Sequence, residues 1–86
     1  MYRTFTIYIQ DNKNVSENLL EVLGFIDYAN RGWLRDENNS AVVDTLLHAL
    51  TDIGYKWVVE FEYETVFEEG KKRFETIQEW AEWYDN

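Results

Sequence analysis

The chain has no cysteine, no proline and a single histidine, His48. Without cysteine, neither a disulfide nor a thiolate metal site can form. With one histidine, a zinc, iron or copper site would have to consist almost entirely of carboxylates, which is unusual. The four glycines stand apart at positions 24, 32, 54 and 70, so the sequence also lacks a glycine-rich phosphate-binding loop.

Long apolar runs are missing as well. No stretch approaches the roughly 20 apolar residues that a membrane-spanning helix needs, and residues 1–9 alternate instead of forming the apolar segment of a signal peptide. Small secreted domains usually carry disulfides, so we expect a cytoplasmic protein. With 86 residues, no Pro-rich linker and no long internal repeat, residues 1–86 are expected to form one domain.

The chain is instead rich in aromatic and acidic residues. It contains five Phe, six Tyr and four Trp, and each buried ring removes roughly 150–250 Å² from water, so even a short chain can build a core. Its 17 acidic and 8 basic residues give a formal net charge of −9, which repels nucleic acid and anionic lipid. We therefore expect a basic protein surface as the partner, with no direct binding to nucleic acid or membrane. The alternative is that the charge only maintains solubility.

Hydrophobic periodicity predicts an α+β fold in the order β-α-α-β-β-α. Segments that alternate are expected to be strands, and segments with apolar residues at helical spacing are expected to be helices. The expected elements are a strand at 2–10, a helix at 15–30, a loop at 33–39, a helix at 41–52, a strand at 55–67, a hairpin turn at 68–71, a return strand at 72–75 and a helix from residue 76. We expect about three strands in an antiparallel or mixed sheet, covered by helices on one face.

Local signals support the starts of the last two helices. Asn39 or Ser40 is the expected N-cap of the helix at 41–52. Thr76 and Glu79 have the spacing of a capping box at the start of the C-terminal helix. Both assignments follow from side-chain oxygens that accept hydrogen bonds from the otherwise unpaired N–H groups of a first helical turn.

The glycines and one aromatic residue receive specific assignments. Gly24 is placed inside the first helix, where it costs about 1 kcal/mol relative to Ala. Gly54 is expected to end the second helix. Gly70 is expected to supply a positive φ angle in the hairpin turn. Phe67 is assigned to the inner face of the strand at 55–67.

Two groupings resemble chemical sites, and neither is complete. Asp44, His48 and Asp52 lie at four-residue steps on one helix face and could hold a metal weakly, but a solvated polar face has the same pattern. The loop that begins at Asp36 lacks the glycine and the final glutamate of a calcium-binding EF-hand loop. Any nucleophile would need His48 as its base, and His48 faces away from the apolar stripe of its helix. We expect no catalytic residues, no metal and no cofactor, and a chain that is not an enzyme.

Acidic residues line the strand at 55–67 and the last helix. Glu60, Glu62 and Glu64 alternate on one strand face, so their side chains stand about 6.6–6.8 Å apart, similar to the charge spacing of a nucleic-acid backbone. From residue 57 to 70 there are five Glu and no basic residue. An ordinary solvent-exposed face remains the alternative. The predicted partner-binding residues are Glu60, Glu62, Glu64, Glu68, Glu69, Glu75, Glu79, Glu82 and Trp83.

Aromatic rings supply a second indication of an interface. Trp80, Trp83 and Tyr84 are neighbours on one short helix and cannot all face the same core, and Trp33 falls in a predicted loop. Exposed rings beside acids are typical of a protein interface, but the same rings could close a thin core or form a homodimer seam. The alternative function is therefore a self-associating structural or accessory protein. The basic run at 71–73 is expected to guard a sheet edge against strand pairing, and pairing of this run with nearby Glu residues is left open.

In size, charge and the Glu60-Glu62-Glu64 row, the chain resembles small acidic inhibitor proteins of phages and mobile elements, such as anti-CRISPR and anti-restriction proteins. Such proteins often block a nuclease by occupying its basic nucleic-acid channel. The resemblance implies a DNA mimic that evades host defence in the host cell cytoplasm. It is a likeness of composition and carries over no functional residues. An immunity protein against a toxic nuclease is a close variant of this function.

Overall fold

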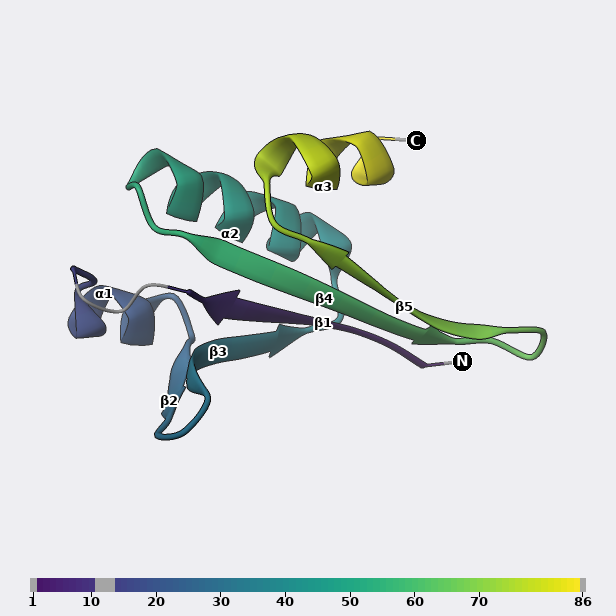
Figure 1. Ribbon diagram of the computed structural model, residues 1–86, viewed down its shortest axis with the longest axis horizontal. Helices are drawn as coiled ribbons and strands as arrows, with labels where there is room; N and C mark the ends of the chain where they lie inside the picture. The colour runs from purple at the N-terminus through teal and green to yellow at the C-terminus, as the bar shows by residue number, and fades with distance from the viewer. Residues whose placement is uncertain (1, 11–13, 86) are drawn as a thin grey trace.

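The described residues form five strands and three helices in the order β-α-β-β-α-β-β-α (Figure 1). The structure is a computed structural model and describes residues 2–10 and 14–85. The α+β class is confirmed, whereas the order β-α-α-β-β-α and the estimate of about three strands are wrong. The elements are β1 (Tyr2–Ile9), α1 (Glu17–Val22), β2 (Ile26–Tyr28), β3 (Gly32–Glu37), α2 (Ser40–Asp52), β4 (Trp57–Glu64), β5 (Glu69–Phe74) and α3 (Ile77–Tyr84).

The strands form one sheet with the order β2-β3-β1-β4-β5, in which every neighbouring pair is antiparallel. β1 is the central strand and pairs with β3 on one side and with β4 along its whole length on the other. The β4–β5 hairpin extends beyond the helices and gives the molecule its elongated shape (Figure 1). None of the helices in the described part of the chain is long and apolar enough to cross a membrane.

The core lies on the sheet face that α2 and α3 cover. Phe5 of β1 and Phe61 of β4 are opposite one another in the register and stack with ring centroids 4.4 Å apart. Alternation is confirmed in β1, because Thr4, Thr6 and Tyr8 point to the other face and are partly exposed. The helices contribute to this core the buried side chains of Leu20, Val43, Leu46, Leu47, Leu50 and Trp80.

The helix predicted at 15–30 spans only Glu17–Val22, and Gly24 is the physical reason for its early end. Gly24 has φ +82°, a left-handed conformation that ends the helix. The amide of Phe25 donates to the carbonyl of Leu20 (2.9 Å), and the amide of Gly24 donates to that of Glu21 (3.0 Å), which is a Schellman motif. The chain then turns into β2, and Val22, whose spacing from Leu19 and Ile26 suits the apolar side of the predicted helix, is 81% exposed.

The segment predicted as a loop at 33–39 is mostly the strand β3. It pairs with β1, with Phe5 opposite Glu37 and Tyr8 opposite Leu34, and with the short strand β2. Trp33 and Leu34 are both buried. The strand ends where Asn39 caps α2, its side-chain oxygen accepting from the amides of Ala41 and Val42, so the predicted cap is confirmed.

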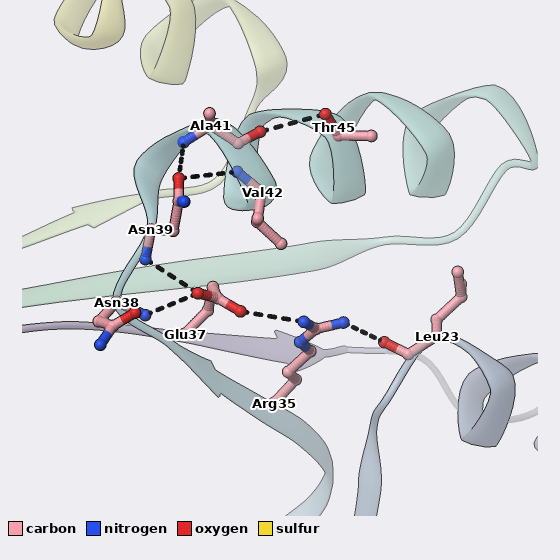
Figure 2. A network of polar contacts seen from close by, with 8 residues as sticks. All are labelled: Leu23, Arg35, Glu37, Asn38, Asn39, Ala41, Val42 and Thr45. Carbon is pink, nitrogen blue, oxygen red and sulfur yellow. Dashed lines mark hydrogen bonds and ion pairs between the residues drawn. The ribbon is translucent and has the colours of Figure 1, made fainter.

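A polar network ties the end of α1 to the start of α2 through β3 (Figure 2). Arg35 donates from Nη1 to the carbonyl oxygen of Leu23 (2.6 Å) and from Nη2 to Oε1 of Glu37 (2.9 Å). The other carboxylate oxygen of Glu37 accepts from the amides of Asn38 (3.0 Å) and Asn39 (2.9 Å). These backbone hydrogen bonds, together with Arg35, hold the pKa of Glu37 below its usual value despite partial burial.

The predicted hairpin turn is displaced by three residues. β4 ends at Glu64, residues 65–68 form the turn, and β5 begins at Glu69. Gly70 therefore lies in a strand without a positive φ angle, and the ring of Tyr63 covers it. Phe67, which was assigned to the inner face, lies in the turn and is exposed. At the other end of β5, Thr76 caps α3 as predicted.

Candidate partner-binding surface

The predicted acidic row lies on the outer face of β4, away from α2 and α3, and a lysine neutralises part of it. The register places Lys71 of β5 opposite Glu62. Lys71 Nζ lies 3.2 Å from Oε1 of Glu62 and 3.5 Å from Oε2 of Glu60. The hydrogen bond to Glu62 and the charge of Glu60 raise the pKa of Lys71. Glu60 and Glu62 are therefore not part of a continuous line of unpaired negative charge.

Two more of the predicted acids take part in holding the fold. Arg73 donates from Nε (3.2 Å) and Nη2 (3.0 Å) to Oε1 of Glu75. Glu79 accepts from the amide of Glu75 and from the hydroxyl of Thr76, and Thr76 accepts from the amide of Glu79. This arrangement confirms the capping contact from Thr76 to Glu79. Glu82 lies exposed on α3.

Negative charge also gathers at the tip of the β4–β5 hairpin, at Glu64, Glu68 and Glu69. Within the described residues, the side chains of Glu64, Glu68 and Glu69 form no ion pair. Glu64 and Glu69 are directly opposite one another across the two strands, an arrangement of like charges that destabilises a hairpin. The tip thus keeps three exposed carboxylates at a cost in stability.

Two apolar residues between these acids were missed by the sequence analysis. Val66 and Phe67 are the most exposed large hydrophobic residues among those described, at 93% and 95%. They were missed because the alternation of β4 continues through them in the sequence. The usable signal was Thr65, because a Thr hydroxyl can accept hydrogen bonds from the amides two and three residues further along and so begin a turn.

The tryptophans mostly serve the core. Trp33, Trp57 and Trp80 are buried, and Trp80 Nε1 donates to Oδ1 of Asp44 (2.8 Å). Trp83 is half-buried, and its neighbours in ring contact are Phe5, Phe61, Phe74 and Trp80. Trp83 is therefore an edge of the core rather than a projecting anchor. A homodimer seam of exposed rings stays a prediction without support from the positions of the tryptophans.

The helix-face trio of Asp44, His48 and Asp52 does not assemble into a site. His48 Nε2 lies 3.4 Å from Oδ1 of Asp44, the oxygen that also accepts from Trp80. Asp52 is exposed one turn further along α2. Across residues 2–10 and 14–85, no group of three or more acidic or histidine side chains is placed to hold a metal ion.

Comparison with known proteins provides no relative from which a function could be transferred. No protein-family model matches the chain, and neither a curated protein nor a solved structure has significant similarity to it.

Proposed function

We propose that this chain is an acidic protein-binding module that inhibits its partner by occupying a basic nucleic-acid-binding surface. The observation that carries the proposal is the tip of the β4–β5 hairpin, where Glu64, Glu68 and Glu69 have no ion-pair partner among residues 2–10 and 14–85. The opposed pair of Glu64 and Glu69 lowers the stability of the hairpin, and a partner with basic residues would relieve that repulsion.

The same surface suits a charge-steered encounter. With a net charge of −9, the chain attracts basic surfaces over a distance of about 10 Å at moderate salt. Because the hairpin projects past the helices (Figure 1), its carboxylates can approach a concave surface that the rest of the domain cannot enter. A groove that binds nucleic acid is both concave and basic, which is why we propose mimicry of DNA or RNA as the mode of inhibition.

The proposal is tested with proteins that bind nucleic acid. An extract of the source cells is fractionated on heparin, and the retained proteins are passed over the immobilised chain. We expect a retained protein that elutes with salt and that duplex DNA or RNA displaces. Replacing Glu64, Glu68 and Glu69 by Gln should weaken binding about tenfold, since each exposed ion pair contributes about 0.2–1 kcal/mol.

A matched control separates this surface from net charge alone. Glu21, Asp27 and Asp52 are exposed and lie outside the β4–β5 hairpin, and replacing them by Gln, Asn and Asn changes the net charge by the same amount. We expect this control to bind like the parent chain. Equal weakening of both variants would refute a specific acidic surface, and binding that nucleic acid cannot displace would refute the mimicry.

A further inference from the structure

The hairpin tip places two large apolar side chains in solvent. Val66 and Phe67 are 93% and 95% exposed, although neighbouring rings such as Phe61 and Phe74 are buried. Burying one such side chain in a partner releases enough free energy to raise the binding affinity about tenfold or more. An exposed pair at the far end of a projecting hairpin (Figure 1) contributes nothing to the core and is available to another molecule.

The turn that carries this pair is ordered by its own hydrogen bonds. The amide of Thr65 donates to the carbonyl oxygen of Glu68 (2.7 Å), and the Thr65 hydroxyl donates to the same oxygen (3.1 Å). The hydroxyl also accepts from the amides of Phe67 (3.2 Å) and Glu68 (3.0 Å). Since these bonds fix the backbone on both sides of the pair, less conformational entropy is lost when the tip binds.

The hairpin below the turn is also braced. The Tyr63 ring covers Gly70 on one side of the hairpin, and Lys71 joins two β4 glutamates on the other. Aromatic cover of a strand glycine is a recognised way to stabilise strand pairing. The tip is therefore held at a fixed position relative to the domain, as an anchor residue requires.

We propose that Val66 and Phe67 anchor the chain by entering an apolar pocket of a partner protein whose rim carries lysine and arginine. The charge of the rim follows from the three tip carboxylates at positions 64, 68 and 69, which flank the pair. The same carboxylates oppose entry into an anionic membrane. A second copy of this chain also carries a net charge of −9 and would be repelled. This inference rests on the proposed function and assigns the apolar contact with the partner to Val66 and Phe67.

A photo-cross-linking amino acid tests the anchor directly. Benzoylphenylalanine replaces Phe67 in one preparation and the exposed α3 residue Gln78 in another. Each is irradiated in the heparin-retained fraction of the source-cell extract. We expect an adduct from position 67 whose cross-linked peptide contains apolar residues with lysine or arginine nearby. The adduct should disappear when Glu68 and Glu69 are changed to Lys, since the ring is retained but the charge complementarity is lost.

Competition experiments measure how much Phe67 contributes to the binding affinity. Unlabelled parent chain should suppress the adduct, and Phe67→Ser should need at least ten times the concentration. Ile53→Ser removes another exposed apolar side chain and should compete like the parent. Circular dichroism establishes that each variant is folded.

The outcomes separate the anchor from the function it rests on. A partner adduct at position 78 with none at 67 would overturn the anchor and leave the binding module intact. No partner adduct at either position would overturn the anchor, whereas a loss of salt-sensitive retention on the immobilised chain would overturn the binding module. An adduct of position 67 with lipid or with a second copy of the chain, or one unaffected by the charge reversal, would also overturn the proposed pocket.

Discussion

Glu37→Gln should destabilise the fold in a way that depends on pH. The Glu37 carboxylate accepts hydrogen bonds from two amides and from Arg35, and its side chain is only 16% exposed (Figure 2). Hydrogen bonds to a charged group contribute about 1.5–3 kcal/mol and those to a neutral one about 0.5–1.5 kcal/mol. Gln keeps one acceptor oxygen but loses the charge, so we expect a loss of about 2 kcal/mol at neutral pH.

The sign of the pH dependence follows from the pKa of Glu37, which the fold lowers from its ordinary value of 4.5. A carboxyl group with a lowered pKa stabilises the fold above its unfolded-state pKa, and this contribution is lost as pH falls through the folded-state pKa. The difference in stability between the parent and Glu37→Gln should therefore be largest at neutral pH and shrink in acid.

Urea unfolding, followed by tryptophan fluorescence, measures this difference at several values between about pH 7 and pH 3. At neutral pH the midpoint should shift by about 1 M, given an m-value of roughly 1–3 kcal/mol/M. Glu64→Gln makes the same chemical change at a carboxylate outside this network and should raise the midpoint slightly rather than lower it, because it removes the repulsion between Glu64 and Glu69. A loss that is constant across the pH range would refute the carboxylate charge as its source.

Two further substitutions test other contacts. Gly24 and Gly54 have φ +82° and +83°, but an added Cβ at 24 would lie 2.9 Å from Nη1 of Arg35, whereas one at 54 meets open space. In thermal unfolding, Gly24→Ala should cost about 2–3 kcal/mol and Gly54→Ala about 1 kcal/mol, and equal losses would mean that Arg35 moves aside freely. Lys71→Gln frees two β4 glutamates and should delay elution from an anion exchanger more than Lys72→Gln does; equal delays would show that the neutralisation is unimportant.

The first helix could have been bounded correctly from the sequence. Leu23-Gly24-Phe25 and Ile53-Gly54-Tyr55 have the same pattern, and both form a Schellman motif in which the aromatic amide reaches back five residues. At Gly54 this pattern correctly predicted the end of a helix. At Gly24 the helix was predicted to continue, because apolar residues follow at helical spacing up to Ile26. Ile26 is exposed in β2, so the periodicity beyond the glycine was accidental.

The strand β3 was harder to predict, because its partner is distant in the sequence. Phe5 pairs with Glu37 across about 30 residues, and the adjacent residues Trp33 and Leu34 are both buried. A strand with two consecutive buried residues has no clean alternation to recognise. Its pairing depends on β1 being present, which is a tertiary effect that local patterns do not contain.

The candidate surface was predicted in the wrong place because the hairpin turn was predicted three residues too far along the chain. A turn at 68–71 would set Glu64 opposite Glu75 and leave Glu60 and Glu62 without partners in the return strand, so the predicted register put no lysine opposite the row. Thr65 instead closes the turn at 65–68 and brings Lys71 opposite Glu62. The same three-residue shift moves Phe67 from the expected inner face to the exposed tip. The neutralised row and the apolar tip are thus consequences of one register, so a binding surface on this hairpin must be sought at its end rather than along its length.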